Sequence, residues 1–206
     1  MTEQSAKTTD NQAEMMRAEI LHHAHQLFAH YGYWKTNIGD IAQCCGMSPA
    51  NLYRYFRNKQ AIGVAAVHQY FRMVETSMET VLMLPGETAE MRIKQFLRTG
   101  VQHLADELER NPKIVELAEF LCEDEDGMEI LAEHIGWKRA RLTAEIQRGI
   151  ASGELKPCDA EATATAMLNA LKAFWMPMTL ATWRDKETIL PELNAIVDLM
   201  FRGIQA

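Results

Sequence analysis

Apolar residues recur along this chain at intervals of three and four positions, which is the spacing of amphipathic helices. A clear early example contains Ile20, Ala24, Leu27 and Phe28, and Gly32 ends it. No segment shows the apolar–polar alternation of a β-strand, and there is no internal repeat. The pattern therefore predicts an all-α protein of about nine helices.

Helix boundaries follow from capping residues, prolines and glycines. The expected starts of the second, third and fourth helices are Thr36 or Asn37, Ser48-Pro49 and Asn58. The expected ends of the first, second and fourth helices are Gly32, Gly46 and Pro85-Gly86, and the third helix is expected to run to about Phe56. Five further helices are predicted at about 88–109, 113–122, 128–152, 159–182 and 188–204. Pro177 is expected to kink the helix that contains it.

This pattern divides the chain into three parts. The polar start, over residues 1–14, is predicted to be a disordered tail. Residues 15–60 form an expected three-helix head, and residues 61–206 form a larger helical domain.

Charge is unevenly distributed between these parts. The formal net charge is -7, yet residues 1–70 contain six Lys or Arg against five Asp or Glu, whereas residues 71–206 contain fifteen against twenty-three. Between Lys35 and Lys59, four basic residues face the single acidic residue Asp40. A local basic patch on an otherwise acidic chain favours a protein that contacts phosphate with one end only.

Composition narrows the protein class further. With 48% hydrophobic and 24% charged residues, the chain has the make-up of a globular protein with a substantial core. It shows neither a signal peptide nor an apolar run long enough to cross a membrane, so a cytoplasmic protein without a membrane partner is expected. The four cysteines show no CxxC spacing, which favours reduced thiols over a metal site or a disulfide framework. Cys44 and Cys45 are expected to be buried and inert, and oxidant sensing by them is the alternative.

The segment from Ile38 to Phe56, IGDIAQCCGMSPANLYRYF, has the pattern of a helix-turn-helix. Such a motif needs a small residue in its first helix and a glycine in its turn, and Ala42 and Gly46 stand at those positions. Apolar residues that would lock the two helices together are Ile38, Ile41, Met47 and Leu52. The second helix would then offer polar and flat side chains to a DNA major groove. A helical hairpin that only packs against the rest of the protein is the alternative.

The stretch from Ile20 to about Ile62 resembles the DNA-binding domain of the TetR (tetracycline-repressor) family. The pattern that carries the resemblance is IL..A..LF..YGYWKTNIGDIA...GMSPANLYRYFRNKQAI. It covers a fifth to a quarter of the chain, and the remainder matches the family by helical character and length. The resemblance implies a three-helix helix-turn-helix head, followed by a helical domain that binds a ligand and dimerises.

The resemblance also implies contacts with double-stranded operator DNA. Tyr53 and Lys59 match positions that contact phosphates, and Thr36 or Asn37 is expected to meet phosphate at the start of the second helix. Base edges would be contacted chiefly by Ala50, Asn51 and Tyr55, with Ser48 and Arg54 on the same surface. An asparagine amide pairs well with adenine, and an alanine methyl group with the methyl group of thymine. Gly39 replaces a longer side chain common in relatives, which argues against a base contact from the second helix.

By the same resemblance, the last two helices are expected to pair with those of a second copy. Their apolar residues are Ala164, Met167, Leu168, Leu171, Phe174 and Trp175 on one helix, and Leu190, Leu193, Ile196, Val197, Met200 and Phe201 on the other. A homodimer would present two heads to two DNA half-sites. The alternative is that both faces are internal core.

A ligand pocket is expected in the helical domain, lined by Met73, Phe96, His103, Phe120, Trp137 and Trp175. Thioethers and aromatic rings suit an adaptable apolar cavity, although the same residue types also form ordinary cores. An apolar or aromatic effector is favoured over a strongly anionic one, because the domain lacks a concentrated basic cluster. We expect a regulator, most commonly a repressor, whose DNA affinity changes when the effector binds.

Other functions find less support in the sequence. A di-iron enzyme would need paired ExxH motifs, and only Glu19-Ile-Leu-His22 fits. HExxH, GxSxG and phosphate-loop motifs are absent from the sequence, so no catalytic residue, metal site or cofactor is predicted. A helical interaction protein without DNA binding, and a DNA-binding regulator without an effector, are the alternatives to a ligand-responsive regulator.

Overall fold

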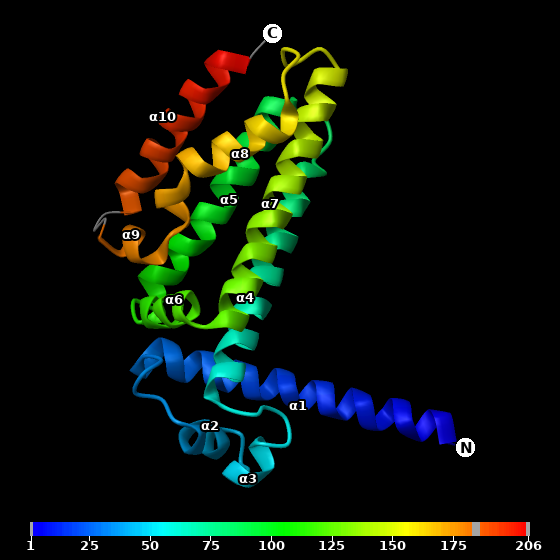
Figure 1. Ribbon diagram of the computed structural model, residues 1–206, viewed down its shortest axis with the longest axis vertical. Coiled ribbons are helices and arrows are strands. Elements are labelled where there is room, and N and C mark those ends of the chain that lie inside the picture. Colours follow the sequence, from blue (N-terminus) through cyan, green and yellow to red (C-terminus); the bar gives the residue numbers. More distant parts are fainter. Residues whose placement is uncertain (1, 183–185, 205–206) are drawn as a thin grey trace. The chain divides into compact units, whose positions relative to one another are not determined.

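The computed structural model describes residues 2–182 and 186–204. Within these ranges the chain forms ten α-helices and one 3-10 helix and no β-strand, which confirms the all-α prediction (Figure 1). The elements are α1 (Thr2–Tyr31), α2 (Ile38–Cys44), α3 (Pro49–Leu52), α4 (Lys59–Leu82), α5 (Ala89–Arg110), α6 (Ile114–Glu123), α7 (Glu125–Ala151), α8 (Ala160–Ala170), η1 (Lys172–Trp175), α9 (Pro177–Thr182) and α10 (Lys186–Ile204).

Three helices differ from their predicted lengths. Helix α1 extends back to Thr2, through the segment predicted to be a disordered tail, because residues 2–14 contain no glycine or proline that would stop a helix. Helix α3 ends at Leu52, and the chain continues as a tight turn to Phe56. The helix predicted over 159–182 is divided into α8, η1 and α9, and Pro177, which lacks the N–H needed to continue a helix, begins α9.

The chain forms two compact units. The first comprises Met1–Gln69 and Lys113–Met128, and the second comprises Tyr70–Pro112 and Glu129–Ala206. The predicted head, residues 15–60, lies within the first unit, which we call the head unit. This unit also takes in the start of α4 and all of α6, which had been assigned to the larger domain.

The core of the head unit joins α1, α2, α3 and α6 through buried apolar side chains. Ile20, Phe28, Ile41 and Leu52 are fully buried. The Phe120 ring of α6 stacks on the buried Tyr33 ring, with centroids 4.3 Å apart. This aromatic contact explains why α6 belongs to the head unit.

The second unit has a larger core of its own. Fully buried residues come from α4, α5, α7 and α10 and include Met78, Phe96, Leu142 and Leu193. Because the core draws on helices far apart in sequence, burial of apolar surface stabilises this unit as a whole.

Removal of the Phe120 ring is expected to destabilise the head unit. A Phe120→Ala substitution should lower the free energy of unfolding by about 3 kcal/mol, because it leaves a cavity beside Tyr33. Denaturant unfolding followed by circular dichroism measures this loss. Tyr53→Ala is the control: its ring is 53% exposed, so the change should stay within about 0.5 kcal/mol. Equal stability of both variants would contradict the packing described here.

Candidate nucleic-acid interface and effector cavity

The turn between α2 and α3 is fixed by a glycine and two backbone hydrogen bonds. Gly46 adopts a φ of 63°, a conformation that other residues adopt only at a cost. The amide of Gly46 donates to Gln43 O at 3.1 Å, and the amide of Met47 donates to Ala42 O at 2.9 Å. This pair of bonds forms a Schellman motif, which ends α2 and directs the chain into α3.

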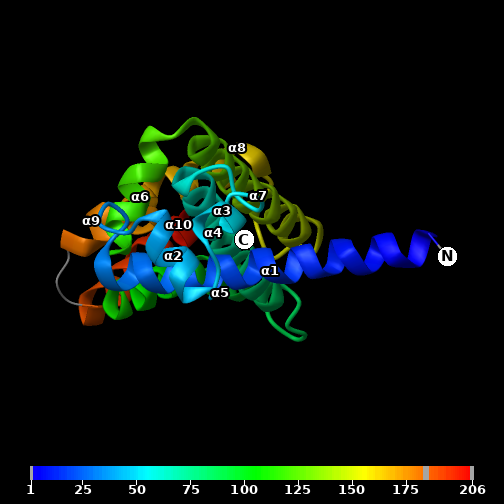
Figure 2. The same ribbon diagram turned by 90° about the horizontal axis from the view of Figure 1, so that it is seen from below.

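Helix α3 begins with a capping side chain followed by proline, as predicted. The Ser48 hydroxyl oxygen accepts a hydrogen bond from Asn51 N at 3.2 Å, and Pro49 occupies the first helical position. Leu52 and Phe56 are buried, which places their neighbours on the outer face. Figure 2 shows α2 and α3 beside α1 within the head unit.

The residues predicted to face DNA between Ser48 and Tyr55 are all at least partly accessible. Ser48, Ala50, Tyr53 and Arg54 are exposed, and Asn51 and Tyr55 are half-buried. Tyr53 leaves 53% of its surface exposed. The structure therefore brings all six residues together on one short, accessible segment.

The start of α2 distinguishes Asn37 from Thr36. Asn37 is exposed and forms a capping box: its Oδ1 accepts from Asp40 N, and its own N–H donates to Asp40 Oδ2, both at 3.0 Å. Thr36 is 2% exposed, and its hydroxyl donates to Gly32 O at 2.8 Å. The sequence predicted a phosphate contact from either residue. The Thr36 side chain is too buried to reach a phosphate, so Asn37 remains the candidate.

Lys59, the first residue of α4, already uses part of its ammonium group within the head. Its Nζ donates to Tyr33 O at 3.0 Å and to Thr36 O at 3.1 Å. The same Nζ lies 4.3 Å from the centroid of the Tyr33 ring. Burial lowers the pKa of Lys59. A lysine ammonium carries three N–H donors, so one remains after these two bonds.

Two features of this region were not anticipated from sequence. Trp34 exposes 54% of its surface on the loop before α2, and its backbone N–H donates to Glu116 Oε2 of α6 at 3.2 Å. Cys44, expected to be buried, is exposed at the end of α2; burial raises the pKa of its neighbour Cys45. Neither position follows from local sequence, because both depend on contacts with other helices.

The predicted ligand-binding residues do not form a single cluster. Phe96 and Trp137 stack with centroids 5.8 Å apart in the second unit. Phe120 instead belongs to the core of the head unit, because it stacks on Tyr33. Met73 is 50% exposed and lies on the surface. The prediction was therefore wrong for Phe120, and Met73 does not lie in the interior of the second unit.

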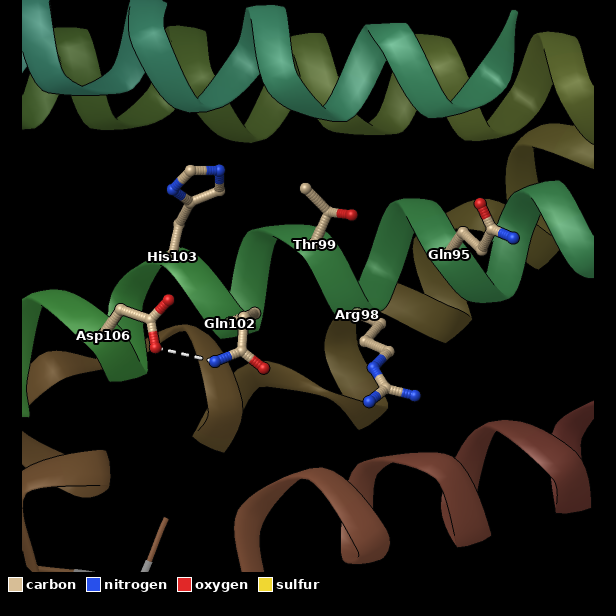
Figure 3. Close-up of a pocket in the computed structure, with 6 residues that line it drawn as sticks. All are labelled: Gln95, Arg98, Thr99, Gln102, His103 and Asp106. Carbon is tan, nitrogen blue, oxygen red and sulfur yellow. Dashed lines mark hydrogen bonds between the residues drawn. The ribbon is translucent and has the colours of Figure 1, made fainter. Parts of the chain in front are cut away.

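A hollow of about 200 Å³ lies along α5 (Figure 3). Polar side chains line it: Gln95, Arg98, Thr99, Gln102, His103 and Asp106. Gln102 Nε2 donates to Asp106 Oδ1 at 2.7 Å. Of the predicted ligand residues, His103 is the one that lines this hollow.

The interior of the second unit also holds charged residues that sequence analysis did not single out. Glu75, His134 and Lys138 are each less than 8% exposed. The positions of His134 and Lys138 on α7 could have indicated from sequence that both are buried. Lys138 stands four residues before the buried Leu142, and His134 four residues before Lys138, so both lie on the buried face of the helix.

Family comparisons cover most of the chain. Residues 20–66 match the model described as "Bacterial regulatory proteins, tetR family". Residues 89–197, more than half of the chain, match the model described as "Tetracyclin repressor-like, C-terminal domain".

Individual curated relatives share only a quarter to a third of their aligned residues with this chain. An uncharacterised HTH-type transcriptional regulator of Bacillus subtilis, YhgD, is 25% identical over 86% of this chain and 92% of its own length. YezE of the same organism is 29% identical over 45% of this chain, and the match spans only about half of that relative (47%). The Escherichia coli regulator RutR is 33% identical over 34% of each protein.

Solved structures share the fold across almost the whole chain. A tetR-family regulator from Mesorhizobium loti superimposes with a TM-score of 0.73 at 20% identity, covering 94% of this chain and 98% of the other. A TetR transcription regulator from Haloarcula marismortui gives a TM-score of 0.74 at 19% identity, covering 94% and 100%.

The two carbonyl contacts of Lys59 predict a structural role. A Lys59→Met substitution should lower the free energy of unfolding by about 1–3 kcal/mol, because two carbonyls of the 33–36 loop lose their donor. Thermal or denaturant unfolding measures the change. Arg54→Met is the matched control, since Arg54 is exposed and its replacement should leave stability unchanged. A Lys59 variant as stable as wild type would show that these bonds contribute nothing to the head.

Proposed function

Because the chain belongs to the tetR family of bacterial regulatory proteins, it is a DNA-binding transcriptional regulator, and we propose that it represses transcription as an effector-responsive homodimer. The observation that carries this proposal is the exposure of Ser48, Ala50, Tyr53 and Arg54 along α3 and its flanking residues, directly after the Gly46 turn. The likeness of residues 89–197 to a domain described as tetracycline-repressor-like supports repression in particular.

Base recognition is assigned to the first part of α3. Ala50 and Asn51 follow the helix N-terminus, the part of a recognition helix that meets base edges. The Asn51 backbone is held by Ser48, which leaves its side-chain amide available to pair with adenine. Tyr55 is half-buried and lies at the end of the same surface.

Phosphate contacts are assigned to the residues around this face. Tyr53 and Arg54 are exposed in the turn that follows α3, and Asn37 is exposed as the N-cap of α2. Lys59 has one N–H donor beyond its two carbonyl bonds. Positive charge and helix N-termini attract phosphate whatever the DNA sequence, so these residues would orient the head on the duplex.

Dimerisation is assigned to the outer surfaces of α8 and α10. Most of the apolar residues first considered for the interface, including Met167, Leu193 and Phe201, are buried in the core of the second unit. What remains outside is Leu199, which is 67% exposed on α10, with small residues on both helices. These exposed small residues are Ala162, Ala166 and Ala170 on α8 and Ala195 and Gly203 on α10. Small side chains permit close approach of helices from a second copy.

Effector response is assigned to the second unit. Phe96, Trp137 and Trp175 provide flat aromatic surfaces there, which suit an aromatic effector. An effector that binds the DNA-free form a hundredfold more tightly than the DNA-binding form would shift the equilibrium by about 2.7 kcal/mol. Helix α4 contributes residues to both units, so it is the element through which we propose that binding is communicated.

The DNA interface is tested with an operator selected from a random duplex pool. Fluorescence anisotropy at several salt concentrations should show affinity falling steeply with salt. Arg54→Met should weaken binding to all sequences and reduce the slope of log affinity against log salt by about one. Asn51→Ala should cost about 1–3 kcal/mol and relax selectivity at one base pair.

The matched control for the interface is Arg139→Met, an exposed arginine on α7. It should bind as wild type does. If Asn51→Ala and Arg54→Met also bind with wild-type affinity and slope, the assignment of α3 to the major groove is incorrect.

The dimer is tested by placing a charge at its proposed centre. Leu199→Glu should give a monomer in sedimentation velocity and weaken operator binding at least tenfold, because one head contacts too few bases. Met83→Glu, at an equally exposed position beyond α4, should remain dimeric. A Leu199→Glu variant that stays dimeric places the interface elsewhere.

A further inference from the structure

Among the described residues of the second unit, one lysine in the interior has no hydrogen-bonding partner. Lys138 on α7 is 4% exposed, and its Nζ lies 4.1 Å from the centroid of the Trp175 ring. Within the described part of the chain, this ammonium makes no hydrogen bond and no ion pair. Burial lowers the pKa of Lys138 to about 8, so the charged form still predominates at pH 7. Lys138 therefore places a positive charge inside this unit with no hydrogen-bond acceptor among the described residues.

Other buried charge in this unit is paired more completely. Glu145 on the same helix is 1% exposed, and its carboxylate binds Arg92 at 2.6 Å and Arg148 at 2.9 Å. An unpaired buried charge costs several kcal/mol by general estimates, so such groups are normally matched in this way. Among the described residues, Glu145 therefore has two counter-ions, whereas Lys138 has no hydrogen-bonding partner that a ligand would need to displace.

The Trp175 indole, whose ring lies against Lys138, carries a second donor without an acceptor among the described residues. The Trp175 Nε1 atom is buried and has no hydrogen-bond partner among the described residues. The ring packs against Gly100 of α5, where a Cβ atom would collide with it, so its position is constrained. A buried indole N–H ordinarily finds an acceptor. Lys138 and Trp175 therefore present two donors, and one acceptor group could satisfy both.

The charges around Lys138 leave an excess of one positive charge. The Glu75 carboxylate, which attracts Lys138, also binds Arg72 at 3.1 Å and His134 Nδ1 at 2.9 Å. Burial and the neighbouring Lys138 lower the pKa of His134 to about 3, so its imidazole is neutral at pH 7. The single negative charge of Glu75 is thus shared between the two cations Arg72 and Lys138, which leaves a sum of one positive charge. A ligand with a single negative charge would neutralise the cluster.

A second ion pair nearby does not change this balance. Arg141 lies 5.8 Å from the Trp137 ring centroid and is bound to Glu79 at 2.9 Å. That pair is neutral, so it supplies no counter-charge to Lys138.

Aromatic rings surround the same cluster. Phe71 stacks on the His134 imidazole, with centroids 4.1 Å apart and planes within 4°. Trp137 lies parallel to that imidazole at 6.4 Å, and Phe96 stacks on Trp137 at 5.8 Å. Flat aromatic walls favour a flat aromatic ligand.

We propose that Lys138 and Trp175 bind the carboxylate of an aromatic monocarboxylic acid, whose ring packs among the aromatic side chains beside His134. The two oxygens of one carboxylate accept from Lys138 Nζ and Trp175 Nε1. The inference rests on the proposed effector response only in taking this acid as the effector; the binding site itself does not depend on DNA. It replaces the general expectation of an apolar effector with one that carries a single negative charge.

Isothermal titration calorimetry of the full chain tests the charge requirement. The probes are phenylacetate and indole-3-acetate, each compared with its uncharged amide. The acids should bind at least tenfold more tightly than the amides, because only a carboxylate compensates the buried ammonium. Lys138→Met should abolish this preference while retaining the fold, since methionine replaces the lysine stem with an apolar chain of similar length.

Two further variants separate binding from structure. Lys172→Met removes an exposed lysine from η1, the element that carries Trp175, and should bind the acids as wild type does. Trp175→Phe keeps an aromatic ring but removes the N–H donor, and should weaken acid binding about tenfold. Trp175→Phe also provides an independent test if Lys138→Met does not fold.

The outcomes distinguish this inference from the proposed function. Acids that bind no better than their amides, or that bind the Lys138→Met or Trp175→Phe variants as tightly as wild type, overturn the inference. This result would leave DNA binding intact. Acids that bind through Lys138 but leave operator affinity unchanged support the site and contradict the effector response.

Discussion

The geometry of the DNA-binding head depends on the backbone at Gly46. Its positive φ and the hydrogen bonds from Gly46 N and Met47 N end α2 and set the direction in which α3 begins. Ser48 then caps the new helix, and Leu52 anchors it in the core. This turn therefore fixes where α3 begins, and with it which side chains between Ser48 and Arg54 stay exposed.

Much of this arrangement could be predicted from sequence because its causes are local. The cap at Ser48, the proline at position 49 and the glycine in the turn are each recognisable within a few residues. The division of the predicted 159–182 helix was only partly anticipated, since Pro177 indicates an interruption without specifying whether the helix kinks or breaks.

What could not be predicted depends on contacts between distant segments. Thr36 and Asn37 are equally plausible caps in sequence, and only the packing of the head buries the former. Phe120 is an aromatic residue of the type that often lines an apolar pocket, yet its ring stacks on Tyr33 and belongs to the core of the head unit. In each case the residue type occurs in two common environments, and contacts between distant segments decide which of the two the residue occupies.

Lys59 has a consequence for the thermodynamics of the proposed DNA complex. A flexible surface lysine loses rotamer freedom when it contacts a phosphate, and this loss offsets part of the electrostatic attraction. The Lys59 side chain is already held by the carbonyls of Tyr33 and Thr36 before any duplex is present. The Lys59 side chain therefore loses its rotamer freedom when the protein folds. Its contact with DNA would carry a smaller entropic penalty than a contact made by the exposed Arg54 side chain.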